Sequence, residues 1–178
     1  MDQDGIESSK RLNKTAMNAS FDIQFIKHKD AYELSDADQQ LISKARSIAT
    51  SAYAPYSGFK VASVAMLKNV EFVHGTNQEN ASYPIGLCAE RVMLATLSSV
   101  APDAIVKSIC ISYFSEKLPS DAPIAPCGIC RQSLVEFESR FSTPIRLLLT
   151  GQQGEVYEFE SVTDLLPMAF KKKNLIVN

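Results

Sequence analysis

Two absences limit the function of this 178-residue chain before any motif is considered. Positive charge is not in excess, because 18 Lys and Arg residues stand against 20 Asp and Glu residues and give a formal net charge of −2. A nucleic-acid polymer is therefore not an expected partner. Long apolar runs are also missing: no stretch approaches the length of a membrane span, and none follows the acidic opening Met1-Asp2-Gln3-Asp4 as it would in a signal peptide. We therefore expect a cytoplasmic chain with no membrane partner.

Histidine is scarce, and the cysteines carry more of the argument. His28 and His74 are the two histidines, neither is near a cysteine in the sequence, and both are expected to be surface or structural residues. In a chain expected to be cytoplasmic, four cysteines favour metal binding or catalysis over disulfide bonds.

The composition, with 46% hydrophobic and 21% charged residues, is typical of a globular protein long enough to bury a real core. Residues 1–19 are polar and irregular and are expected to form a flexible tail, followed by a single domain over residues 20–178. Hydrophobic periodicity and turn residues predict the following elements in order: strand 21–26, helix 37–53, strands 59–66 and 71–76, helix 88–98, strand 105–114, helix 127–140, strands 145–149 and 156–159, and a short helix 163–166. This order predicts an α/β three-layer sandwich, with a mixed central sheet and helices on both faces.

The densest chemistry lies at the starts of two predicted helices. Cys88-Ala89-Glu90 opens one of them, and Cys127-x-x-Cys130 opens the next, 39 residues after Cys88. Strand–helix–strand crossovers can bring the two helix N-termini together, where the helix dipoles stabilise thiolates. Three thiolates can hold a Zn²⁺ ion and leave its fourth position open for water. The Glu90 carboxylate beside that water could carry protons, which predicts a hydrolytic site.

Simpler interpretations of the cysteines stay open from spacing alone. Cys127-x-x-Cys130 could be a redox pair, although this would leave Cys88 and Glu90 without a role. Cys110 could be a fourth thiolate that closes a structural zinc site, but it lies in an apolar run in which a free cysteine commonly behaves as a small hydrophobe.

Several motifs in a fixed order resemble cytidine deaminase of the homotetrameric, all-cysteine type. The matching segments are Tyr56-Ser57-Gly58-Phe59-Lys60-Val61, Asn77 to Pro84, Cys88-Ala89-Glu90-Arg91, Pro126 to Gln132, and Leu165 to Phe170. The resemblance extends over about residues 35–170 and leaves the N-terminal extension outside it. It implies zinc-dependent hydrolytic deamination of cytidine and deoxycytidine to uridine and deoxyuridine plus ammonia in pyrimidine salvage. It also implies a homotetramer with one Zn²⁺ per subunit.

The resemblance assigns roles in the chemical step. Cys88, Cys127 and Cys130 would be the zinc ligands, and Glu90 would take the water's proton and pass it to N3 of the base. Charge balance adds a role of its own: the two helix N-termini offset the surplus negative charge of three thiolates, and Arg91 could do so further by bonding to a ligand sulfur.

The resemblance also assigns roles in substrate binding. Phe59 would stack on the pyrimidine, Asn77 and Glu79 would bind the ribose hydroxyls, and backbone groups of Ala89 would contact the base edge. Tyr83 and Phe170 would reach the pocket of a neighbouring subunit. Without the resemblance, ordinary structural roles are favoured for these residues: Phe59 as a core residue of a strand, and Asn77 and Glu79 as turn residues.

Two other functions stay possible at this point. The same chemistry could act on another amine, such as an aminonucleoside antibiotic or a cytosine in a polynucleotide. A non-catalytic zinc module is the other alternative, and it predicts four protein ligands.

Overall fold

The computed structural model describes residues 18–69 and 71–175, so nearly all of the predicted tail lies outside the described residues. Within these two ranges, no helix has the length and apolar character needed to cross a membrane.

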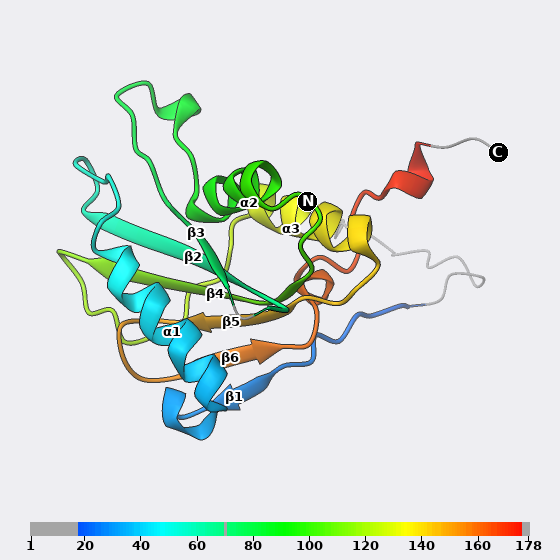
Figure 1. Cartoon of the computed structure of the whole chain (residues 1–178), viewed down its shortest axis with the longest axis horizontal. Coiled ribbons are helices and arrows are strands. Elements are labelled where there is room, and N and C mark those ends of the chain that lie inside the picture. Colours follow the sequence, from blue (N-terminus) through cyan, green and yellow to red (C-terminus); the bar gives the residue numbers. More distant parts are fainter. Residues whose placement is uncertain (1–17, 70, 176–178) are drawn as a thin grey trace, which may run out of the picture.

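A mixed six-stranded sheet forms the middle layer of the fold (Figure 1). Its strands are β1 (Ile26–His28), β2 (Phe59–Leu67), β3 (Phe72–Thr76), β4 (Val106–Ser115), β5 (Arg146–Thr150) and β6 (Val156–Phe159). The order across the sheet is β1-β6-β5-β4-β2-β3. Strands β4 and β5 pair in parallel, and the other neighbours pair antiparallel, including the predicted β2–β3 hairpin.

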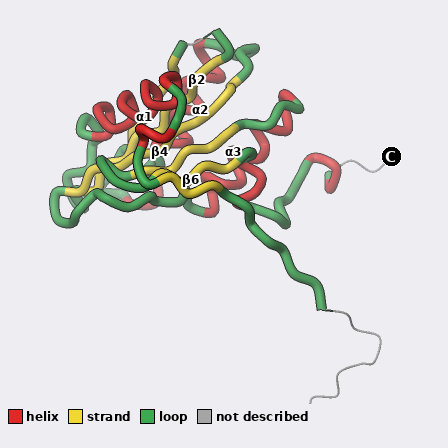
Figure 2. Tube along the Cα trace, turned by 90° about the horizontal axis from the view of Figure 1, so that it is seen from below, coloured by secondary structure: helices red, strands yellow, loops and turns green. Residues whose placement is uncertain are grey.

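Helices cover both faces of the sheet, which confirms the predicted three-layer α/β fold (Figures 1 and 2). The helices are α1 (Asp36–Ala49), α2 (Ala89–Val100) and α3 (Gly128–Phe141), with 3-10 turns at Ala31–Glu33, Tyr83–Ile85, Val162–Leu165 and Lys172–Asn174. Alternating side chains of the central strands face opposite cores. On β4, Ile109 and Ile111 pack with Met93 of α2 and Leu134 of α3, whereas Cys110 packs on the α1 side.

Helix α1 begins as predicted but ends earlier than predicted. The Ser35 side chain caps its start by accepting a hydrogen bond from the Asp38 N–H. The helix ends at Ala49 rather than at residue 53, because the chain then tightens into successive three-residue turns. The hydroxyl groups of Thr50 and Ser51 donate to backbone carbonyls three residues earlier and support these turns.

The predicted strand at residues 21–26 is wrong in position. Strand β1 begins at Ile26 and pairs with β6 only over Ile26–His28. Phe25 instead stacks on the rings of Tyr157 and Phe159, so its contribution is aromatic packing rather than strand pairing. Apart from α1, the remaining predicted elements lie within two residues of their predicted bounds.

Candidate active site

Three cysteine sulfurs converge where α2 and α3 begin. The Sγ atoms of Cys88, Cys127 and Cys130 all lie within 4.8 Å of one another, with 3.9 Å between Cys88 and Cys127 and 3.5 Å between Cys127 and Cys130. Zinc–sulfur bonds of about 2.3 Å in a tetrahedron place the sulfurs about 3.8 Å apart. The three thiols therefore fit a zinc ion with one position left for a non-protein ligand.

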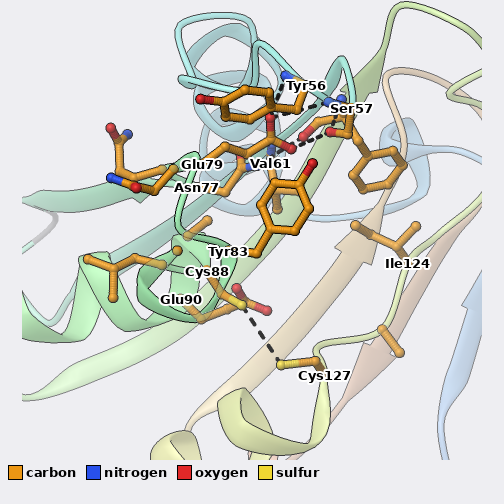
Figure 3. A pocket seen from close by; sticks show the side chains of 17 residues that line it. Tyr56, Ser57, Val61, Asn77, Glu79, Tyr83, Cys88, Glu90, Ile124 and Cys127 are labelled. Atoms are coloured by element: carbon orange, nitrogen blue, oxygen red, sulfur yellow. Dashed lines mark hydrogen bonds between the residues drawn. The ribbon is translucent and has the colours of Figure 1, made fainter.

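The backbone explains why two of these sulfurs point the same way. Cys88 and Cys127 occupy the cap positions of α2 and α3, so each side chain stands at a helix N-terminus. Cys130 follows one turn into α3 and is buried. Because both helices lie on the same face of the sheet (Figure 1) and start close together, the three thiols meet there, as the sequence predicts. Figure 3 shows Cys88 and Cys127 facing each other at this point.

The pKa values of the three clustered thiols are shifted in different directions. Burial raises the pKa of Cys88 and of Cys130. Burial also acts against ionisation of the more exposed Cys127. Hydrogen bonds from the Cys130 backbone N–H and from neighbouring thiols nevertheless leave the pKa of Cys127 below its ordinary value. Loading zinc must therefore displace protons from the cluster.

Cys110 is not part of this cluster. It is fully buried on the α1 side of the sheet, among Leu41, Val64 and Leu148, and burial raises the pKa of its thiol to about 12. Among the described residues the thiol cluster has three members, so the interpretation of Cys110 as a fourth ligand is wrong.

The Glu90 carboxylate lies in the first turn of α2, next to Cys88 (Figure 3). Its side chain is almost fully enclosed, with the residue 5% exposed, and burial raises the pKa of the carboxyl group. A carboxyl group shielded from bulk water beside a metal-ligating cluster is suited to accept and return a proton.

A pocket of about 600 Å³ opens onto the cluster (Figure 3). Its size suits a small molecule. The sequence-predicted residues that line it are Phe59, Asn77, Glu79, Tyr83, Cys88, Ala89, Glu90 and Cys127. The structure therefore brings the predicted substrate residues and the predicted catalytic carboxylate to one cavity, with Ile124 completing the wall beside Cys127.

Asn77 and Glu79 are bound to the chain around Phe59 as well as facing the pocket. The Asn77 side chain donates to the Phe59 carbonyl (2.9 Å) and accepts from the Val61 N–H (2.7 Å). Glu79 accepts from the backbone N–H groups of Tyr56 and Ser57 and from the Ser57 hydroxyl, and these bonds lower the pKa of the carboxyl group. The two polar side chains that line the pocket therefore also hold its wall together.

The residues predicted to act across a subunit boundary lie on the surface of the single chain. Tyr83 is 75% exposed and Phe170 is 58% exposed. Tyr83 reaches the pocket of its own chain, where its ring meets Tyr56 edge-on, and Phe170 does not line that pocket. Arg91 is exposed on α2, and none of the hydrogen bonds among the described residues joins it to a sulfur. Its charge-tuning role stays a prediction.

The sequence analysis missed Gly75 and Arg131. Arg131 donates to the carbonyls of Pro126 (2.8 Å) and Leu165 (3.2 Å), and so it ties the turn before Cys127 to the segment near the C-terminus. Gly75 lies against the first turn of α2. The position of Arg131 directly after the CxxC motif could have indicated a role near the cluster. Nothing in the sequence indicates the close contact at Gly75.

Comparisons with known proteins agree with this geometry. The sequence profile described as "Cytidine and deoxycytidylate deaminase zinc-binding region" matches residues 35–142. A cytidine deaminase of Sporosarcina psychrophila is 33% identical, over 77% of this chain and 93% of its own length. One from Halalkalibacterium halodurans is 32% identical, over 77% of this chain and 96% of its own length. The crystal structure of cytidine deaminase from Burkholderia pseudomallei superposes with a TM-score of 0.64 at 34% identity, covering 77% of this chain and 100% of that one.

Proposed function

This chain belongs to the cytidine deaminase family, and from that membership and the geometry of its pocket we propose that it deaminates cytidine and deoxycytidine. Water replaces the exocyclic amino group of the base, and the products are uridine or deoxyuridine and ammonia. The observation that carries the proposal is the enclosed Glu90 carboxylate beside three converging thiols at the floor of a nucleoside-sized pocket.

The chemical step divides between the metal ligands and one carboxylate. Cys88, Cys127 and Cys130 would hold Zn²⁺, which when bound lowers the pKa of a water molecule and makes it a nucleophile near neutral pH. Glu90 accepts a proton from the attacking water at a carboxylate oxygen and delivers it to N3 of the base. Glu90 then accepts the second proton of that water, from the hydroxyl group now on C4, and transfers it to the departing amino group, which leaves as ammonia. The carboxylate therefore ends the cycle ionised.

The pocket wall would bind and orient the nucleoside. The Phe59 ring, already stacked on Tyr113 at a centroid distance of 4.9 Å, offers its other face to the pyrimidine. Asn77 and Glu79 retain hydrogen-bonding capacity beyond their bonds within the chain, and this capacity suits sugar hydroxyls. Backbone groups of Ala89, at the start of α2, would contact the base edge and place C4 above the thiols.

A homotetramer belongs to the same proposal. The exposed aromatic rings of Tyr83 and Phe170 would be buried by neighbouring subunits and would complete their pockets. Sedimentation of the purified protein tests this directly: a monomer at micromolar concentration would refute it.

The decisive experiment follows ammonia release and the loss of cytidine absorbance with purified, zinc-loaded protein. Glu90→Gln should lower kcat by about 10³-fold or more while zinc stays bound, because the amide cannot carry the proton. Glu136→Gln changes an exposed glutamate on α3 and is the matched control, expected to keep full activity. A zinc-loaded wild-type protein that leaves cytidine unchanged would refute the proposal and direct the search to other amines.

A further inference from the structure

The Ser57 hydroxyl is bonded on two sides, to two different parts of the pocket. It donates to the Oε1 atom of Glu79, and it accepts from the Phe59 backbone N–H at 2.9 Å. The direction of both bonds is fixed, because an amide N–H can only donate and an ionised carboxylate can only accept. A single hydroxyl therefore joins the Glu79 carboxylate to the backbone of Phe59. Figure 3 shows Ser57 beside the Glu79 carboxylate.

The surrounding turn also holds Glu79 through bonds that do not involve the Ser57 hydroxyl. Glu79 is fixed at its backbone by an N–H bond to the Tyr53 carbonyl (2.9 Å), and its Oε2 atom accepts from the N–H groups of Tyr56 (2.8 Å) and Ser57 (3.3 Å). Oε1 has the Ser57 hydroxyl as its bonding partner in the chain. Without that hydroxyl, the carboxylate keeps its hold on the turn through Oε2 but loses the bond that sets the direction of Oε1.

The same bonds limit what Glu79 can offer a ligand. A carboxylate has about four lone-pair sites, and three donors of the chain already use most of them. The remaining site, on Oε1, points where the Ser57 bond directs it. Without that bond, Oε1 would be free to turn toward water. Binding of a sugar hydroxyl would then have to fix the orientation of Oε1 again, and this ordering would lower the affinity.

We propose that Ser57 is a positioning residue for substrate binding, which holds the Glu79 carboxylate and the Phe59 ring in one arrangement matched to a nucleoside. The inference rests on the proposed deamination of cytidine and adds to it a residue that touches neither zinc nor the reacting carbon. Because Ser57 acts on groups that bind the sugar and the ring, its effect falls on binding and leaves the Glu90 proton transfer intact. Binding shared by the ground and transition states changes KM and not kcat.

The experiment measures kcat and KM for cytidine with Ser57→Ala, Ser57→Thr, Glu79→Ala and the double variant Ser57→Ala/Glu79→Ala. We expect Ser57→Ala to raise KM about tenfold with kcat within about twofold of wild type, the effect of losing one hydrogen bond to a charged group. Ser57→Thr keeps the hydroxyl and should restore KM. In the Glu79→Ala background the Ser57 substitution should have little further effect, because the group it orients is gone.

Other results would overturn the inference. An unchanged KM in Ser57→Ala, a kcat that falls as much as kcat/KM, or fully additive losses in the double variant would each assign Ser57 no positioning role. A Ser57→Ala protein that does not fold is replaced by Ser57→Cys, whose weak donor should give an intermediate KM; a wild-type KM there would also refute the role. A wild-type enzyme inactive on cytidine refutes the proposed function instead, so the two failures are distinct.

Discussion

A Cβ atom added to Gly75 of β3 would stand 2.7 Å from the carbonyl oxygen of Ala89, in the first turn of α2, and 2.2 Å from the backbone nitrogen of Met93. Both atoms belong to a helix backbone, which cannot move aside as a side chain can. The absence of a side chain at this position therefore sets the distance between the sheet and α2. The cap residue Cys88 and the proposed proton carrier Glu90 stand on that same turn, so their location depends on Gly75.

We expect Gly75→Ala to displace the start of α2. The free energy of unfolding should fall by about 2 kcal/mol, as for other overpacked sites. The kcat for cytidine should fall at least about tenfold, because displacement of a catalytic group by a fraction of an ångström is costly. Urea unfolding and steady-state kinetics measure the two effects.

Gly128→Ala is the matched control at the start of the other metal-bearing helix. A Cβ at Gly128 meets nothing within 4 Å, and alanine favours a helix more than glycine does. Stability should therefore be equal to or slightly above that of the wild type, and kcat should be unchanged. Equal behaviour of the two variants would contradict the role assigned to Gly75.

Most of the fold follows from local patterns in the sequence. Helix starts at Ser35, Cys88 and Cys127 and the turn between β2 and β3 are encoded within a few residues, and the structure confirms them. The thiol cluster was also predictable, because two crossovers on one face of a sheet bring helix N-termini together.

The features that were missed depend on contacts between distant segments. Alternation at residues 21–26 suggested a strand, but pairing depends on the register of β6, which ends at Phe159. The other missed contacts also join distant segments. Gly75 packs against Ala89, 14 residues away, and the Ser57 hydroxyl bonds to Glu79, 22 residues away. Arg131 donates to the carbonyl of Leu165, 34 residues away.

Removal of single cysteines should separate ligands from core residues. Cys130→Ala removes a sulfur from the cluster, and we expect the purified protein to lose zinc to a chelator that leaves the wild type loaded. Cys110→Ala leaves all three sulfurs in place and should retain one zinc per chain. Metal analysis after dialysis decides the matter; zinc loss from Cys110→Ala with retention in Cys130→Ala would invert the assignment.

Cys110 should also give the protein a distinct loss of stability at alkaline pH. Its pKa is about 12 in the folded chain and about 8.5 when unfolded, so between these values the unfolded state loses a proton that the folded state keeps. Stability is therefore complete below about pH 8.5 and falls by about 1.4 kcal/mol per pH unit above it.

Urea unfolding at pH 8 and pH 10 tests this with Cys110→Ala as the reference. Other titrating groups are shared by both proteins, so they cancel in the difference. The wild type should lose about 2 kcal/mol more than the variant between the two pH values. Parallel losses would show that Cys110 ionises as readily in the folded protein as in the unfolded chain.

Arg146 of β5 holds together two carboxylates with little access to water. It donates to Asp38 of α1 at 3.1 and 3.3 Å and to Glu158 of β6, whose side chains are 6% and 13% exposed. Although burial works against its charge, the hydrogen bonds to Asp38 and Glu158 raise the pKa of the guanidinium. We expect Arg146→Met to lower the free energy of unfolding by about 3 kcal/mol, because it leaves two enclosed negative charges without their shared partner.

Lys27→Met is the control for this variant, because it removes a different and more exposed ion pair, on the edge strand β1. Lys27 and Glu155 lie 2.7 Å apart, but their side chains are 54% and 40% exposed, so water competes with the pair. The loss of stability there should be much smaller than for Arg146→Met, because exposed ion pairs contribute little. Since the site lies on other elements, kcat at 25 °C should be unchanged in both folded variants. Equal destabilisation by the two substitutions would mean that burial of the carboxylates does not determine the contribution of Arg146.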